Sequence, residues 1–125
     1  MSTISTQNEG GLLIVNVVGD LHAAEAVATI NRHYTNGVVK DVIWDFTHGL
    51  LLNTSDSEFR TIAAAVKKTV DDGYRQGAKT VFVGNATVEY GILRMYTAIA
   101  ETSGVHIRYN VFRTVEEAKE WIAGS

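Results

Sequence analysis

Short apolar runs alternate with helical patterns along almost the whole chain, and this alternation constrains the fold more than any other feature of the sequence. Continuous apolar runs such as residues 12–18 are typical of strands covered on both faces. Between these runs lie segments whose apolar residues recur every three or four positions, as on one face of a helix. Strands separated by helices favour parallel pairing with right-handed crossovers.

The first two strands are the exception to this alternation. Only Asn8, Glu9, Gly10 and Gly11 separate residues 4–7 from residues 12–18, and glycine tolerates the positive φ that a tight hairpin needs. The first strand should therefore be antiparallel to the second. The later strands are expected at residues 39–46, 79–83 and 105–111, and the helices between Asp20 and Gly37, at residues 55–75, at residues 86–103 before Gly104, and from Thr114 through Ile122.

These patterns predict one α/β domain spanning residues 1–125. It should have a five-stranded mixed sheet and four helices in the order β-β-α-β-α-β-α-β-α. The loops at the carboxyl ends of the parallel strands are residues 19–22, 47–56 and 84–87. They should share one edge of the sheet, which is where sites usually form in open α/β sheets.

Composition excludes several classes of function. The net charge is -3 and no basic cluster occurs, which argues against binding to nucleic acid. The chain has no cysteine, so thiolate metal sites, disulfides and cysteine nucleophiles are excluded. No apolar run is long enough for insertion into a membrane, and the polar start has no signal-peptide pattern. We expect a cytoplasmic protein without a cofactor.

No catalytic or metal-binding pattern stands out. The histidines, including His22 and His48, lack the spacing of metal ligands. Asp45, His48 and Ser55 are residue types of a hydrolytic triad, but no Gly-x-Ser-x-Gly elbow accompanies them. A minor enzyme using His48 and Asp45 ranks below the non-catalytic readings.

The segment from residue 45 to residue 56 carries the most functional information. Asp45-Phe46-Thr47 ends a buried strand, and Asn53-Thr54-Ser55-Asp56-Ser57 begins the next helix. These two stretches resemble the Asp-Leu-Ser and Asp-Ser-Ser-Gly-Leu motifs of the STAS (SpoIIAA-like) domains of anti-sigma-factor antagonists. Gly19-Asp20-Leu21 is similar to the Gly-Glu-Leu turn of that family. Here Asn53 replaces an acid, Asp56 a glycine and Ser57 a leucine.

The resemblance implies a non-catalytic regulatory or protein-interaction domain with a protein partner. The family's phosphoacceptor serine would fall on Ser55, with Thr54 beside it. In the family, phosphorylation of that serine turns partner binding off. A phosphate at a helix start also meets free backbone N–H groups. The competing interpretation is structural, because Ser55 and Glu58 have the spacing of a capping box. The candidate partner-binding or phosphoacceptor residues are Asp20, Asn53, Thr54, Ser55 and Asn85.

The third helix has more apolar residues than one core-facing stripe requires. Val88, Ile92, Met95 and Ile99 form one stripe, and Tyr90, Leu93 and Tyr96 spread beyond it. We expect the second set to be an association surface for a homodimer. Ordinary core packing is the alternative. A third reading is that the surplus lines a pocket, which would make the chain a stand-alone binder of a small apolar or anionic ligand.

Overall fold

The sheet of this protein has five strands in the order β1-β2-β3-β4-β5, as the computed structural model of residues 2–102 and 106–124 shows. The expected element order and fold class are confirmed. The elements are β1 (Ser2–Glu9), β2 (Leu12–Asp20), α1 (Ala23–His33), β3 (Asp41–Leu50), α2 (Asp56–Asp71), β4 (Lys79–Val83), α3 (Thr87–Glu101), β5 (Arg108–Phe112) and α4 (Val115–Ala123).

β1 and β2 form the predicted hairpin, and their antiparallel pairing runs from Ser2 opposite Gly19 to Glu9 opposite Leu12. Gly10 and Gly11 have φ angles of 57° and 91°, so both turn residues use the conformation that favours glycine. The other strand pairs are parallel. The sheet is therefore mixed, with its one antiparallel strand at the edge.

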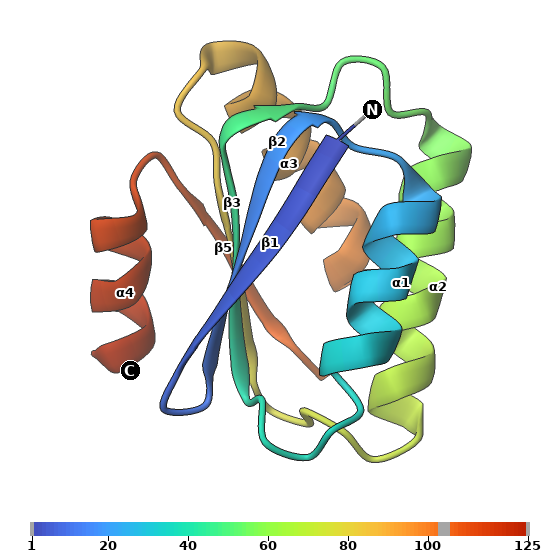
Figure 1. The fold of residues 1–125 in the computed structure, drawn as a ribbon, viewed down its shortest axis with the longest axis vertical. Helices are drawn as coiled ribbons and strands as arrows, with labels where there is room; N and C mark the ends of the chain where they lie inside the picture. The colour runs from blue at the N-terminus through green and yellow to red at the C-terminus, as the bar shows by residue number, and fades with distance from the viewer. Residues whose placement is uncertain (1, 103–105, 125) are drawn as a thin grey trace.

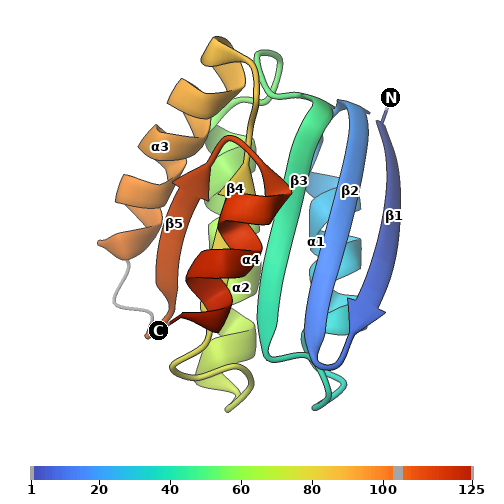
Figure 2. The same cartoon turned by 90° about the vertical axis from the view of Figure 1, so that its left-hand side faces the viewer.

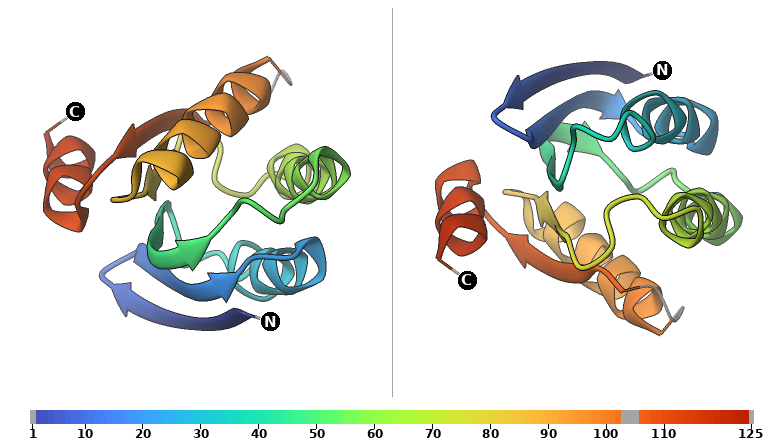
Figure 3. Two further views of the ribbon diagram at one scale, coloured as in Figure 1. Left: turned by 90° about the horizontal axis from the view of Figure 1, so that it is seen from above. Right: turned by 90° about the horizontal axis from the view of Figure 1, so that it is seen from below.

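Three helices cover one face of the sheet and one covers the other (Figures 1 and 2). α1, α2 and α3 cover a large core that includes Leu13, Val15 and Phe82 of the strands and Phe59 and Tyr96 of the helices. α4 alone covers Ile14, Ile43, Val81 and Val83 on the opposite face. Seen along the strands, the sheet lies between these two unequal layers (Figure 3).

Two helices begin without a side-chain cap. β2 continues through Asp20, and the N-cap residue of α1 is His22, whose side chain makes no capping hydrogen bond. The N-cap of α3 is Ala86, again without a side-chain cap. The expected stop at Gly104 and the expected strand start at Val105 lie outside the described residues.

The orientation of α3 corrects the expected association surface. Leu93 and Tyr96 are buried in their own chain, with exposed fractions of 1% and 5%, and Tyr90 is half-buried. The exposed apolar residues are instead Val88, Met95 and Ile99. Placing Leu93 and Tyr96 on an outer surface was wrong because both helix stripes are apolar, and periodicity alone does not say which of them packs on the sheet.

Gly84 sets how closely α3 approaches the sheet. A Cβ atom on Gly84 would lie 2.9 Å from a Leu93 methyl carbon and 3.2 Å from the Tyr90 backbone nitrogen. We predict that Gly84→Ala lowers the free energy of unfolding by about 1–3 kcal/mol, through overpacking. Chemical denaturation measures this change.

Gly91 offers a matched control in the same helix. A Cβ atom there would meet nothing within 4 Å. Gly91→Ala should raise the free energy of unfolding by about 0.5–1 kcal/mol, because alanine is the better helix former. Equal effects of the two substitutions would contradict the close packing at Gly84.

Candidate functional site

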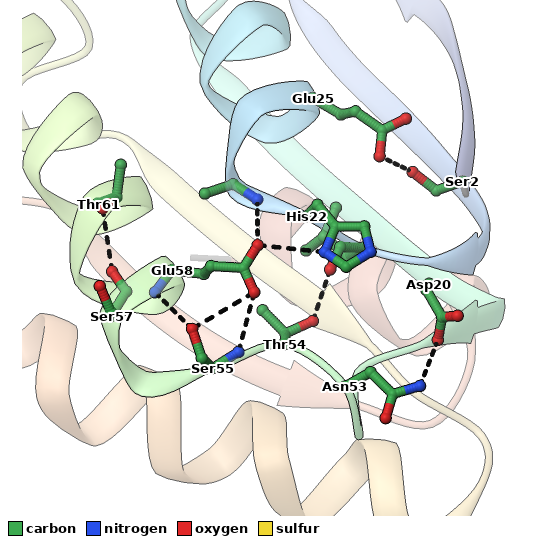
Figure 4. Close-up of polar contacts among 12 residues, drawn as sticks. Ser2, Asp20, His22, Glu25, Asn53, Thr54, Ser55, Ser57, Glu58 and Thr61 are labelled. Carbon is green, nitrogen blue, oxygen red and sulfur yellow. Dashed lines mark hydrogen bonds and ion pairs between the residues drawn. The ribbon is translucent and has the colours of Figure 1, made fainter.

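Two loops at the carboxyl ends of β2 and β3 lie side by side and form the candidate site (Figure 4). One is the β2–α1 connection, which includes Leu21 and His22. The other is the β3–α2 connection, from Leu51 to Ser55. Parallel pairing of β2 with β3 places both strand ends at one edge, with Asp20 opposite Leu50. The expectation that the loops after these strands share an edge is thus met by the geometry.

Hydrogen bonds lock these two loops together. The Thr54 hydroxyl donates to the Leu21 carbonyl at 2.7 Å. The Asn53 side-chain amide donates to the Asp20 carboxylate at 3.3 Å. Beneath the β3–α2 loop, the Leu51 amide donates to the buried carboxylate of Glu89 on α3, at 3.3 Å. These bonds fix the two loops to each other and to α3, so the surface that the loops form has a defined shape.

Ser55 is the N-cap of α2, as the sequence predicts. Its hydroxyl oxygen accepts the Glu58 amide at 3.2 Å, and the Glu58 carboxylate accepts the Ser55 amide at 3.1 Å. These reciprocal bonds form a complete capping box. Asp56 and Glu58 place two negative charges in the first turn, where the helix dipole favours them.

Glu58 also caps α1, a role that the sequence analysis missed. Its second carboxylate oxygen accepts the Ala23 amide at 3.1 Å and lies 3.2 Å from Nδ1 of His22 (Figure 4). The two oxygens of one carboxylate therefore serve the first turns of two helices. No local signal marks this contact; only the adjacency of the β2 and β3 loops brings the two helix starts together.

The backbone amides around Glu58 favour its ionised form. Hydrogen bonds from the Ser55 and Ala23 amides lower the pKa of the Glu58 carboxyl from 4.5 to about 2. His22 adds to this effect, by its hydrogen bond and its charge. The Glu58 carboxyl is therefore ionised at neutral pH.

Ser55 and Thr54 differ in their accessibility to a modifying enzyme. Thr54 has an exposed fraction of 8%, and its hydroxyl is committed to Leu21. Ser55 is exposed, and Asn53 beside it is exposed as well. Of the two candidate phosphoacceptors, Ser55 is the one that a kinase could reach without opening the loop.

The remaining candidate residues do not join this cluster by any hydrogen bond found among the described residues. Asn85 is exposed on the β4–α3 loop, and its carbonyl accepts a hydrogen bond from Arg113 at 3.2 Å. The Asp45 carboxylate accepts hydrogen bonds from the amide and the hydroxyl of Thr47, two residues further along the chain. A triad of Asp45, His48 and Ser55 is therefore not assembled in the described part of the chain.

Two further searches of residues 2–102 and 106–124 gave negative results. These residues contain no group of three or more histidine and carboxylate side chains placed to hold a metal ion. None of their helices is long and apolar enough to cross a membrane.

An apolar cavity lies between α1, α2, α3 and the sheet. Its lining includes Trp44, Phe59, Leu93 and Tyr96. The volume of this cavity, taken as the space that the centre of a water molecule can occupy, is about 30 Å³. That is room for about one or two water molecules and too little for an organic ligand.

Comparison with known proteins shows the fold. No family model matches the sequence, and no curated protein matches it. An anti-sigma factor antagonist from Mycobacterium paratuberculosis is similar in structure, with a TM-score of 0.66 and 17% identity, over 98% of this chain and 95% of that one. The phosphorylated form of the Bacillus cell fate determinant SpoIIAA aligns with a TM-score of 0.56 and 13% identity, over 96% of this chain and 99% of that one.

A third similar structure is an uncharacterized protein with a SpoIIAA-like fold from Shewanella loihica, with a TM-score of 0.58 and 13% identity, over 97% of this chain and 93% of that one. All three comparisons cover nearly the whole of both chains. The protein is thus an α/β domain with an N-terminal hairpin and helices on both faces. More specifically, it has the SpoIIAA-like fold of STAS domains, as the sequence resemblance implied.

The Ser55 cap can be tested by stability. Ser55→Ala removes the acceptor of the Glu58 amide and should lower the free energy of unfolding by about 0.5–2 kcal/mol. Ser57→Ala is the matched control, because Ser57 is exposed and lies in the same turn. It should change stability by less than about 0.5 kcal/mol. Chemical denaturation of both variants measures the two changes. If Ser55→Ala leaves the free energy of unfolding unchanged, the capping role of Ser55 is contradicted.

The lowered pKa of Glu58 predicts a pH dependence of stability. Because the folded-state pKa lies below the ordinary value of 4.5, the carboxylate stabilises the fold above pH 4.5, and this contribution is lost as the pH falls towards about 2. The wild-type protein should therefore lose more stability over this pH range than Glu58→Gln does.

Urea denaturation across this pH range measures the difference. Glu120→Gln is the control, because Glu120 is exposed near the end of α4, and this variant should follow the wild-type curve. The interaction is contradicted if Glu58→Gln also follows that curve.

Proposed function

We propose that this chain is a non-catalytic protein-interaction domain whose binding surface is the pair of loops joined at Glu58. The surface comprises Asp20, His22, Asn53 and Ser55. The similarity in fold to anti-sigma factor antagonists supports a regulatory role with a protein partner. The proposal keeps the cytoplasmic location expected from the sequence.

One observation carries this proposal: an exposed serine hydroxyl stands at a helix start, on a surface that internal hydrogen bonds hold in shape. Asn53 and Ser55 are exposed. Thr54 and Leu21 are buried beneath this surface, and the Thr54 hydroxyl bonds to the Leu21 carbonyl. Such a surface can dock a partner without first paying the entropy of ordering its loops. Its histidine, His22, contacts the Glu58 carboxylate that joins the two loops, so that this pair belongs to the contacts that hold the surface in shape.

We further propose that phosphorylation of Ser55 switches the binding off. A phosphoserine carries a charge of about -1.5 to -2 at neutral pH. Here it would compete with the Glu58 carboxylate for the amides at the start of α2 and would be repelled by Asp56 and Glu58. Displacing Glu58 would also release the Ala23 amide, because one carboxylate serves both helices. The modification would thus change both the charge of the surface and the connection between its two loops.

The alternative function, binding of a small apolar ligand, finds little support in the cavity beside α2. It has room for about one or two water molecules, so a larger ligand requires the helices around it to move away from the sheet. The exposed surface needs no such movement. We therefore place the protein-interaction function first.

Two substitutions of Ser55 separate charge from stability. Ser55→Asp adds a negative charge and retains a good N-cap, whereas Ser55→Ala loses the cap and adds no charge. Used as baits in extracts of the source organism, the wild-type protein and Ser55→Ala should recover the same partner. Ser55→Asp should recover at least about tenfold less of it, which corresponds to about 1.4 kcal/mol. Mass spectrometry measures the recovered partner and maps any phosphate.

Substitutions elsewhere test the position of the surface. Asn53→Arg places a bulky cation on the proposed surface, and Glu116→Arg places the same side chain on exposed α4, which covers the other face of the sheet. Only Asn53→Arg should abolish recovery. Equal recovery by both variants contradicts the binding surface, and equal recovery by Ser55→Asp and wild type contradicts the switch.

A further inference from the structure

A surface depression lies between α3 and β5, at the end of the sheet opposite to β1 (Figure 2). Its wall on α3 includes Tyr90, Arg94 and Glu101, and its wall on β5 includes Tyr109 and Asn110. The space that the centres of water molecules can occupy in it is about 290 Å³. This volume is near the lower end of the range for sites that bind small organic molecules.

Two arginines flank the Tyr90 ring at one end of this depression. The guanidinium carbon of Arg113 lies 4.2 Å from the ring centre, and that of Arg94 lies 5.9 Å from it. Both side chains are exposed, and neither forms an ion pair with a carboxylate of the described residues. This end is therefore positively charged, in a protein whose net charge is -3, and both cations attract an anion placed beside the ring.

Contacts within the chain hold Arg113 in place. Its Nη1 donates to the Asn85 carbonyl at 3.2 Å, and its guanidinium packs on the Tyr90 ring. A guanidinium has five N–H donors, and its planar fork matches the oxygen atoms of a carboxylate or a phosphate. Most of the donors of Arg113 remain for a ligand, so the chemistry of this end favours an oxyanion.

The other end of the depression differs in charge. Glu101 comes seven residues after Arg94 in α3, so the two lie about 10 Å apart along the helix axis. Between the two ends, Tyr109 is half-buried, and burial first and then the charges of Tyr34 and Glu101 raise the pKa of its hydroxyl to about 12. At neutral pH, Tyr109 thus offers an uncharged aromatic surface next to the cationic end.

The free edge of β5 is closed to an added peptide strand at its centre. β4 bonds to the even-numbered residues of β5, as the 2.9 Å bond from the Arg108 amide to the Ala78 carbonyl shows. The Val111 amide therefore faces the free edge, where the side-chain oxygen of Asn110 accepts it at 2.8 Å. Because an added strand would lack this donor, a small molecule that contacts side chains suits the depression better.

We propose that this depression binds a small organic oxyanion, either a carboxylate or a phosphate ester. Its anionic group accepts hydrogen bonds from Arg94 and Arg113, and its uncharged part covers Tyr109. None of the residues of the proposed partner-binding surface lines the depression. The two proposals are therefore independent, and the test below needs only the purified protein.

Amide NMR spectra recorded during titration with phenyl phosphate, at constant ionic strength, test this inference. We expect a Kd between about 0.1 and 10 mM, with shifts centred on Tyr90, Arg94 and residues 109–113. Inorganic phosphate should bind at least about threefold more weakly, because it has no ring to contact Tyr109. Benzoate carries the same ring on a carboxylate. Binding of either aromatic probe supports the site, and the tighter one shows which oxyanion it prefers.

Substitutions of exposed residues locate the anionic group. Arg94→Gln and Arg113→Gln should each weaken binding of phenyl phosphate by about tenfold, because each removes a charged donor. Glu101→Gln removes a repelling charge and should strengthen binding by about twofold. Arg60→Gln is the control, because Arg60 is an exposed arginine on α2 that lines a different depression, and it should leave the Kd unchanged. Thermal unfolding of all four variants should match the wild type.

Three results would overturn the proposal. The first is the absence of any shift with phenyl phosphate or benzoate up to about 50 mM. The second is a Kd that Arg94→Gln and Arg113→Gln leave unchanged, or that Arg60→Gln weakens equally, since the attraction would then be unspecific. The third is equal binding of phenyl phosphate and inorganic phosphate, which would show that Tyr109 has no part in the site.

Discussion

Two helices of this protein begin at the same carboxylate. Glu58 accepts the Ser55 amide in the first turn of its own helix and the Ala23 amide at the start of α1. Neither His22 nor Asp20 supplies a side-chain cap for α1, so α1 depends on a residue of α2. Glu58 thus ties the start of α1 to the start of α2, directly beside the exposed Ser55.

The connection between the helices also explains how one hydroxyl could control a wider surface. A group that competes with Glu58 for the α2 amides acts on α1 as well, because the carboxylate cannot leave one helix and keep the geometry of both. Thr54 and Asn53 add direct bonds from the same loop to Leu21 and Asp20. These bonds join the two loops directly, which is the connection that the proposed switch would use.

Most of the fold is predictable from the sequence, because its signals are local. The glycine pair predicts the hairpin, the apolar runs predict the strands, and the spacing of Ser55 and Glu58 predicts the capping box. What sequence reasoning missed depends on distant partners. The Ala23–Glu58 contact joins residues 35 positions apart. Likewise, α3 has two apolar stripes, and only packing on the sheet shows that Leu93 and Tyr96 face inward while Met95 faces outward.

Amide hydrogen exchange at Ala23 tests the central claim most directly. The shared cap predicts that the Ala23 and Ser55 amides are protected in the wild-type protein and lose that protection in Glu58→Ala. Amides in the centre of β3, such as that of Ile43, should keep theirs, because that strand is fully buried there. If Ala23 exchanges at the same rate with and without the Glu58 carboxylate, α1 does not depend on α2, and the account of a coupled surface is contradicted.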